Sequence, residues 1–285
     1  MTAVSTIEIE VAGRRLSGRT IEPDGAPRAL VIALHGGSYS SAYYDLRSGD
    51  RSSALQNFAD LGYRVIALDR PGYGAAADAG PVDCSFAAQA DVLRTAIAQL
   101  HDGLPAFLMG HSIGGMIAMT VAAGLVDAPL SGVMASSMGM VWRPGILEMW
   151  SSLISDAPQV AVPNEARDQL MFVADLADPA VQREAGADLH PIPAEELRGA
   201  VTWHETMPAV AAEIRVPVLH VLPEHDGIWA SDEHAQQQAA AALKGVDGAT
   251  VVVQRGAGHS IDAHRAGWAH HLATAAFFET CAVTR

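Results

Sequence analysis

The chain has 285 residues, of which 49% are hydrophobic and 18% are charged. This composition supports a large buried core and excludes intrinsic disorder. Lysine and arginine number 18 against 32 aspartates and glutamates, so the net charge is −14. A surface this negative repels phosphate backbones and anionic membrane faces, which disfavours nucleic acid and membranes as partners. The two cysteines, Cys84 and Cys281, show no metal or redox spacing and exclude a disulfide framework.

The first residues of the chain lack a basic stretch followed by an apolar run, which is the pattern of a secretory signal. No apolar run approaches the roughly 20 residues that a membrane helix needs. We therefore expect a cytoplasmic protein whose partner is a small-molecule substrate, and the sequence leaves its oligomeric state open.

Apolar residues alternate with polar or small ones over residues 7–11, and residues 16–21 form a second short extended stretch after a turn at Gly13, which predicts an antiparallel hairpin at a sheet edge. Beyond a turn-rich segment, short and nearly continuous apolar runs predict strands buried on both faces, as in a parallel sheet covered by helices. These runs cover residues 29–34, 63–68, 106–109, 130–135, 216–222 and 249–253. Helical spacing predicts helices over residues 53–61, 86–100, 113–125, 235–243 and 264–278.

Residues 139–212 break this alternation, because they contain helical patterns and no comparable strand. We predict an α/β fold with a mostly parallel, eight-stranded sheet flanked by helices. A helical cap (residues 139–212) is inserted between two late strands, and residues 1–138 and 213–285 form the core.

A Gly-His-Ser-Ile-Gly turn at residues 110–114 joins a predicted strand to a predicted helix. On a turn this sharp, a nucleophile leaves no room for a β-carbon two residues to either side, so glycine is needed there. The pattern alone is weak in a chain rich in glycine and serine. The strand before it and the helix after it supply the context that makes Ser112 a candidate nucleophile.

A serine hydroxyl needs a base, and the base needs a carboxylate to orient it. Asp226 follows one late strand and His259 follows the next, so the three candidates occur in the order Ser, Asp, His. Glu224 is the alternative acid, although it lies nearer to the end of its strand.

An oxyanion hole requires backbone N–H groups beside the nucleophile. The run 29–34 ends in His35-Gly36-Gly37-Ser38, where the unhindered backbone can turn an N–H toward a developing negative charge. The amide of Ile113, at the start of its helix, is the second candidate donor.

Together these motifs resemble those of the α/β-hydrolase family over essentially the whole chain. The resemblance implies Ser112 as the nucleophile, His259 as the base, Asp226 as its acid and the inserted segment as a lid. A serine at this turn argues against the dehalogenase and epoxide-hydrolase branches, whose nucleophile is an aspartate. The segments that carry the resemblance are residues 35–37 (His-Gly-Gly), 69–74 (Asp-Arg-Pro-Gly-Tyr-Gly), 110–115 (Gly-His-Ser-Ile-Gly-Gly), 223–226 (Pro-Glu-His-Asp) and 256–259 (Gly-Ala-Gly-His).

The glycine run after His35 is shorter than in one lipase and esterase branch of the family. Ser38 stands where a third glycine would be, so the oxyanion donor is left open between Gly37 and Ser38. Neither a phosphate loop nor a dinucleotide-binding pattern fits the sequence, and we expect no cofactor. The pair His270-His271 has no matching carboxylate spacing, and we expect no metal site.

The leading functional prediction is a serine hydrolase that cleaves a carboxylic ester, thioester or lactone through an acyl-enzyme. The same triad could instead catalyse acyl transfer or a lyase-type elimination, and a catalytically silent binding protein is a third possibility. Methionines and tryptophans gather in or beside the inserted segment, where they either line an apolar substrate pocket or form the core of the cap. Trp142 and Trp150 in this segment, and Ser38 after the first parallel strand, are the candidates for substrate binding. Residues 139–213 carry twelve acidic residues against four arginines and no lysine, which favours a neutral substrate over a strongly anionic one.

Overall fold

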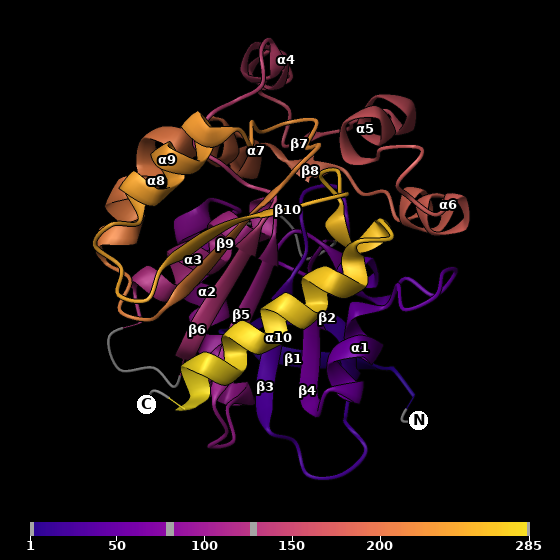
Figure 1. Cartoon of the computed structure of the whole chain (residues 1–285), viewed down its shortest axis with the longest axis vertical. Coiled ribbons are helices and arrows are strands. Elements are labelled where there is room, and N and C mark those ends of the chain that lie inside the picture. The colour runs from indigo at the N-terminus through magenta and orange to yellow at the C-terminus, as the bar shows by residue number, and fades with distance from the viewer. Residues whose placement is uncertain (1–2, 78–82, 126–129, 284–285) are drawn as a thin grey trace.

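An eight-stranded sheet runs through the protein in the order β1-β2-β4-β3-β5-β6-β9-β10 (Figure 1). It is seen in a computed structural model that describes residues 3–77, 83–125 and 130–283. Strands β1 and β2 form an antiparallel hairpin, and β2 is also antiparallel to β4. The remaining strands pair in parallel, as predicted. The strands are β1 (Ser5–Val11), β2 (Arg14–Ile21), β3 (Ala29–Leu34), β4 (Tyr63–Leu68), β5 (Ala106–His111), β6 (Leu130–Ser136), β9 (Val218–Pro223) and β10 (Thr250–Gln254).

The burial of the strands explains their sequence patterns. Every residue of β3, β5, β6 and β9 is buried, because helices cover both faces of the sheet there. The hairpin lies at the sheet edge, where exposed and more buried positions alternate along β1. A strand with two covered faces needs apolar residues throughout, whereas an edge strand needs them at every second position.

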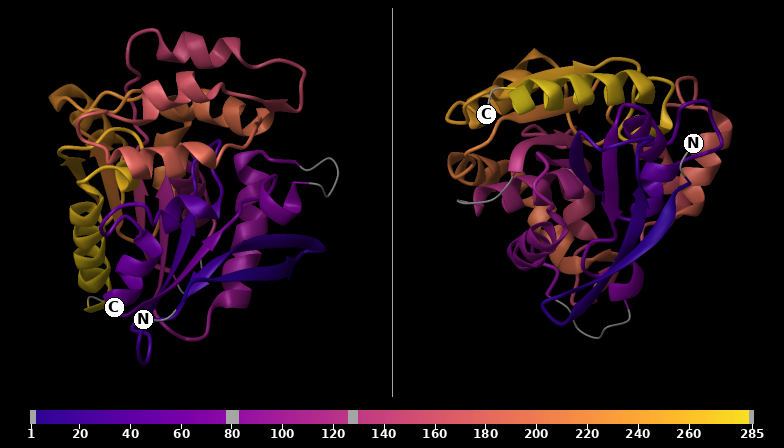
Figure 2. Two further views of the ribbon diagram at one scale, coloured as in Figure 1. Left: turned by 90° about the vertical axis from the view of Figure 1, so that its right-hand side faces the viewer. Right: turned by 90° about the horizontal axis from the view of Figure 1, so that it is seen from below.

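Helices α1 and α10 cover one face of the sheet, and α2 and α3 cover the other (Figures 1 and 2). The serine or aspartate before α1, α2 and α9 accepts a hydrogen bond from an amide of the first turn. Helices α1 and α2 start within one residue of the predicted position, and α9 starts two residues before it. The predicted α/β class with flanking helices is confirmed. The core helices are α1 (Ala54–Asp60), α2 (Phe86–Leu100), α3 (Ile113–Ala123), α9 (Glu233–Ala242) and α10 (Gly267–Val283), with 3-10 turns η1 (Ser41–Asp45), η2 (Gly74–Ala76) and η3 (Ile261–Ala263).

Residues 139–212 lie between β6 and β9 and are called the insert below. Helices α4 to α7 lie beyond the ends of the central strands (Figure 2), whereas α8 packs beside α3 and α9 on the flank of the sheet. A two-stranded antiparallel pair, β7 with β8, was not predicted, because strands of two residues leave no periodicity to detect. The elements of the insert are α4 (Ile146–Ser152), β7 (Gln159–Val160), α5 (Asn164–Met171), α6 (Pro179–Ala187), β8 (Ile192–Pro193), α7 (Ala194–Val201) and α8 (Trp203–Ala212).

None of the helices in the described part of the chain combines the length and the apolar character that crossing a membrane requires.

Candidate active site

Ser112 occupies the sharp turn between β5 and α3, at a positive φ of 53° that non-glycine residues rarely adopt. The glycines around it are needed for space. A β-carbon at Gly110 would lie 2.4 Å from the carbonyl oxygen of Gly114, and one at Gly114 would lie 2.1 Å from that of Leu34. The turn is held by a 2.8 Å hydrogen bond from the Ser112 amide to the Ser136 carbonyl oxygen. The close packing at the two glycines and this hydrogen bond therefore hold Ser112 in its strained backbone conformation.

The structure brings the three candidate catalytic residues together. The Oγ of Ser112 lies 2.9 Å from Nε2 of His259, and Nδ1 of His259 lies 2.9 Å and 3.0 Å from the two carboxylate oxygens of Asp226. A carboxylate only accepts hydrogen bonds, so Nδ1 of His259 carries the proton and Nε2 is left to accept the Ser112 hydroxyl. This arrangement can transfer a proton from the serine to the histidine.

The carboxylate of Asp226 is held by the chain that follows it. Its Oδ1 accepts hydrogen bonds from the amides of Ile228 (2.7 Å) and Trp229 (3.2 Å), and its side chain is fully buried. Glu224, the alternative acid, instead accepts a 2.8 Å hydrogen bond from the Gly256 amide and is 39% exposed. The structure therefore gives His259 one carboxylate partner, and it is Asp226.

The candidate oxyanion donors lie beside the nucleophile. Gly37, Ser38 and Ile113 line the same pocket as Ser112. A β-carbon on Gly37 would approach Cδ1 of Ile113 to 2.9 Å, so the two segments are in close contact. As the first residue of α3, Ile113 has no acceptor for its amide within the helix.

The pocket above Ser112 is narrow and encloses about 490 Å³, its opening to solvent included. Trp142 packs against Trp229 with ring centroids 3.8 Å apart and ring planes tilted by 34°, and its Nε1 donates a 3.1 Å hydrogen bond to Nδ1 of His204. Trp150 is buried on α4. The other lining residues are Met116, Val162, Arg167, Met171, Ile192, Leu197, Ala200 and Ile228.

Sequence reasoning missed several of these residues, of which Trp229 and Arg167 matter most. Trp229 lies three positions after Asp226, so its closeness to the acid was a usable signal. Arg167 is 1% exposed and is the charged side chain among the described pocket residues. Its guanidinium already donates to the carboxylate of Asp168 and to the carbonyl oxygens of Gly186 (2.8 Å) and Asp188 (3.3 Å). Its charge is therefore balanced within the protein.

A second histidine, His111, lies behind the triad. Its ring stacks on Tyr43 at 4.5 Å, and its Nε2 lies 3.0 Å from the carbonyl oxygen of His259, which also accepts a 2.6 Å hydrogen bond from Oγ of Ser137. Burial and the neighbouring His259 lower the pKa of His111 to about 3. His111 therefore stays neutral at physiological pH and fixes the backbone of His259 without adding a competing charge.

Among the described residues, no group of three or more histidine, cysteine, aspartate and glutamate side chains is placed to hold a metal ion. His270 and His271 are both buried in α10, away from the pocket.

Comparison with known proteins gives one family and several relatives. Residues 31–271 match the alpha/beta hydrolase family. The monoacylglycerol lipase of Mycolicibacterium smegmatis is 28% identical over 228 residues, which are 76% of this chain and 76% of that protein. The monoglyceride lipase of Homo sapiens is 34% identical over 119 residues, which are 40% of this chain and 37% of that protein.

Solved structures also resemble this chain. A soluble variant of monoglyceride lipase from Saccharomyces cerevisiae superimposes with a TM-score of 0.78 at 14% identity, covering 99% of this chain and 96% of that one. E-2-(acetamidomethylene)succinate hydrolase gives a TM-score of 0.70 at 18% identity, covering 97% and 100%. These likenesses show that the sheet and its flanking helices have the predicted α/β-hydrolase fold.

Proposed function

The chain belongs to the alpha/beta hydrolase family, and on this premise we propose that it is a serine hydrolase that cleaves small, largely apolar, neutral carboxylic esters, thioesters or lactones. The observation that carries the proposal is the continuous hydrogen-bond chain from Ser112 through His259 to Asp226, at an apolar pocket. The chemistry needs no cofactor, and its partner is a small-molecule substrate rather than a nucleic acid or a membrane.

The mechanism follows from the hydrogen bonds. Nε2 of His259 takes the hydroxyl proton of Ser112 while Oγ forms a bond to the substrate carbonyl carbon. The negative charge that develops on the carbonyl oxygen is stabilised by the amides of Gly37 and Ile113. The imidazolium, stabilised by Asp226, then gives its proton to the leaving oxygen or sulfur. Water repeats the sequence on the acyl-enzyme and releases the acid.

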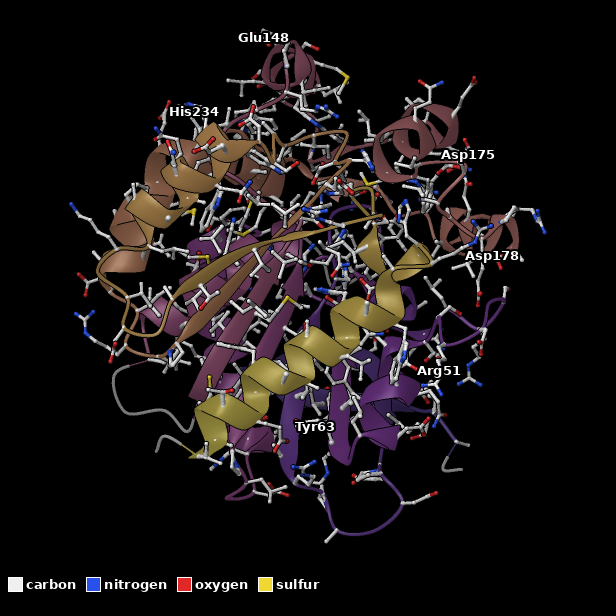
Figure 3. All side chains as sticks on the ribbon, viewed as in Figure 1. Arg51, Tyr63, Glu148, Asp175, Asp178 and His234 are labelled. Carbon is white, nitrogen blue, oxygen red and sulfur yellow. The ribbon has the colours of Figure 1, made fainter. Side chains whose placement is uncertain are left out.

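The substrate class follows from the walls of the pocket and from its charges. The lining is mostly apolar, and Arg167 is already paired with Asp168, so no unbalanced cation is offered to an anionic substrate. Of the twelve acidic residues at positions 139–213, all of which the structure describes, only Glu196 is buried. Glu148 and Asp175, for example, lie on the outer side of the insert (Figure 3). The names of the monoacylglycerol lipase relatives support neutral glycerol esters as the first compounds to test.

The decisive experiment labels the protein with a fluorophosphonate and assays short acyl esters, with Ser112→Ala as the matched variant. We expect labelling and hydrolysis by the wild type, and neither by Ser112→Ala, whose thermal stability is unchanged. More than a trace of activity in Ser112→Ala would overturn the assignment of the nucleophile. Labelling of the wild type without hydrolysis would favour acyl transfer or elimination, and no labelling would favour a binding protein.

The charge argument has its own test. We expect a neutral ester to be turned over faster than the coenzyme A thioester of the same acyl group, because the surface of the insert repels the phosphates. The opposite preference at low ionic strength would contradict the neutral-substrate proposal and leave the serine mechanism intact.

A further inference from the structure

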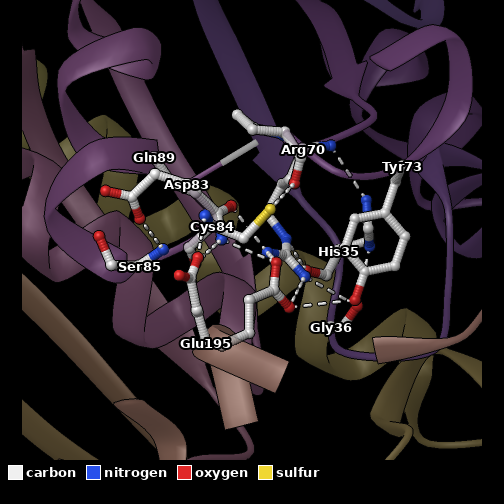
Figure 4. A network of polar contacts seen from close by, with 11 residues as sticks. His35, Gly36, Arg70, Tyr73, Asp83, Cys84, Ser85, Gln89 and Glu195 are labelled. Atoms are coloured by element: carbon white, nitrogen blue, oxygen red, sulfur yellow. Dashed lines mark hydrogen bonds and ion pairs between the residues drawn. The ribbon is translucent and has the colours of Figure 1, made fainter. Parts of the chain in front are cut away.

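Arg70, in the loop after β4, is fully buried and has an acceptor for each of its five guanidinium N–H groups (Figure 4). Nε donates to the carbonyl oxygen of His35 (2.8 Å), and one Nη2 N–H donates to that of Gly36 (3.2 Å). The other three donate to Oε1 of Gln89 (3.0 Å) and to both carboxylate oxygens of Glu196. A buried guanidinium with every donor satisfied has one stable orientation.

The bond to Gly36 determines where the next amide points. The carbonyl of Gly36 and the N–H of Gly37 belong to the same peptide unit, which is planar and directs the two groups in opposite directions. The Gly36 oxygen faces Arg70, so the Gly37 N–H faces away from it. Gly37 lines the pocket beside Ser112, whereas Arg70 does not. This geometry favours Gly37 over Ser38 as the oxyanion donor.

His35 holds the same carbonyl from a second side. Its Nε2 accepts a 3.2 Å hydrogen bond from the Arg70 amide, so the proton is on Nδ1, which lies 2.8 Å from the Gly36 oxygen and donates to it. Burial, followed by the charge of Arg70, lowers the pKa of His35 well below its usual value. A neutral His35 keeps this tautomer at physiological pH.

Glu196 connects this arrangement to the insert. It lies on α7, 126 positions from Arg70, and its side chain is fully buried. Its oxygens also accept hydrogen bonds from Gln89 (2.7 Å) and Tyr73 (3.0 Å). The next residue on the helix, Leu197, lines the pocket.

We propose that Glu196 and Arg70 are positioning residues for the oxyanion hole: Glu196 of the insert holds the guanidinium, and the guanidinium holds the Gly36–Gly37 peptide with its N–H toward the reacting carbonyl. This proposal rests on the proposed serine hydrolase function. It adds that the orientation of the Gly37 amide, in the core, depends on Glu196, in the insert. An insert displaced at α7 removes Glu196 from Arg70 and leaves Nδ1 of His35 as the remaining firm donor to the Gly36 carbonyl.

The test compares Glu196→Gln with Glu195→Gln, a neighbouring glutamate that is exposed and accepts from the Cys84 amide. We expect Glu196→Gln to lower kcat by about 10²-fold with KM changed less than about threefold, as expected for a misplaced catalytic group. Its affinity for a trifluoromethyl ketone, which forms a charged tetrahedral adduct, falls by a similar factor. Amide exchange in the peptide that contains residues 35–38 becomes faster. Glu195→Gln stays within about twofold of wild type in all three.

A second variant separates positioning from folding. In Arg70→Met with Glu196→Leu, apolar residues of similar size replace the pair, which removes both charges together. The double variant also leaves Tyr73, Gln89 and the carbonyl oxygens of His35 and Gly36 with fewer hydrogen bonds, so we expect a lower Tm. Assayed at a temperature where circular dichroism shows the native fold, the double variant should still show the low kcat and the fast exchange. Wild-type kcat and exchange in the folded double variant, or a Glu196→Gln variant unchanged in kcat and exchange, would overturn the proposal. A wild type that neither hydrolyses esters nor reacts with fluorophosphonate would refute the hydrolase function instead, and amide exchange would still decide the positioning role.

Discussion

Two acid–histidine pairs are buried among the residues that the structure describes, and one of these two faces the pocket. In the first, His259 and Asp226 meet at 2.9 Å, and the second ring nitrogen of His259 reaches Ser112. In the other, Nε2 of His271 lies 2.8 Å from Oδ1 of Asp262, in the contact between α10 and η3. By residue type and distance the two pairs are nearly the same.

Their difference lies in what the second ring nitrogen contacts. Nδ1 of His271 lies 2.9 Å from the side-chain amide nitrogen of Asn57, which also donates to the Arg51 carbonyl oxygen. An amide nitrogen only donates, so Nδ1 accepts and the ring has no lone pair left to act as a base. An acid–histidine pair can act as a base only when the nitrogen opposite the acid has a lone pair free to accept a proton from a reacting group.

Asp226→Asn produces the largest effect that we expect. An amide can stabilise the wrong tautomer of His259 and cannot stabilise the imidazolium, and the corresponding change in a serine protease costs about 10⁴ in kcat. We expect a loss of that size, measured as kcat on a short acyl ester, with the fold retained by circular dichroism.

Glu224→Gln is the matched control for this change, because its carboxylate accepts from Gly256 and not from His259. We expect it to remain within about threefold of wild type, since exposed polar substitutions rarely change more than about 0.5 kcal/mol. The reverse ranking of the two variants would transfer the role of the acid to Glu224.

Asp262→Asn makes the same substitution in the other pair, and we expect it to lower stability and leave kcat nearly unchanged. Burial alone would raise the pKa of Asp262, but its interactions with the neighbouring histidines, above all the hydrogen bond with His271, outweigh burial and lower it. The folded state therefore stabilises the carboxylate, and losing a buried charged hydrogen bond costs about 3 kcal/mol. Urea unfolding at neutral pH should show this loss while kcat stays within about threefold. A large loss of kcat without a loss of stability would mean that the second pair also serves the reaction.

Much of the fold could be predicted from the sequence, because strands covered on both faces need continuous apolar runs and edge strands need alternation. The candidates for the triad could also be predicted, because each lies within about five residues of a strand end. The Arg70–Glu196 pair could not, since its members are 126 positions apart and no local periodicity links them. The choice between Asp226 and Glu224 likewise depended on which loop carboxylate the fold turns toward His259.

Buried histidines beside the second pair should make stability depend on pH. Burial lowers the pKa of His270 to about 4, with Asp262 opposing and His271 adding to the shift. Between that value and the usual 6.5, the unfolded chain binds a proton that the folded chain does not, so stability is greatest above pH 6.5 and falls as the pH is lowered toward 4. His270 should contribute on the order of 2–3 kcal/mol to this loss.

His270→Leu tests this contribution against the exposed His234 on α9 (Figure 3). We expect the free energy of unfolding of His270→Leu, measured in urea at pH 7, 5.5 and 4, to fall less steeply than that of the wild type. His234→Gln should keep the wild-type slope. Equal slopes for all three proteins would mean that His270 is charged in the folded state.

The smallest effect that we expect concerns the walls of the pocket, where a side chain can serve the substrate, the core or both. Trp142 is half-buried, packs against Trp229 and lines the pocket, whereas Trp150 is 6% exposed. Removing part of an apolar binding surface should raise KM by about tenfold, or 1.4 kcal/mol. Trp142→Ala should do so with little change in Tm, and Trp150→Ala should do so with some loss of Tm. Trp268 lies under the guanidinium of Arg51 and is not one of the pocket residues, so Trp268→Ala should leave KM unchanged. If both pocket variants lose stability while KM and kcat stay at wild-type values, these tryptophans form the core of the insert, and substrate binding depends on other walls of the pocket.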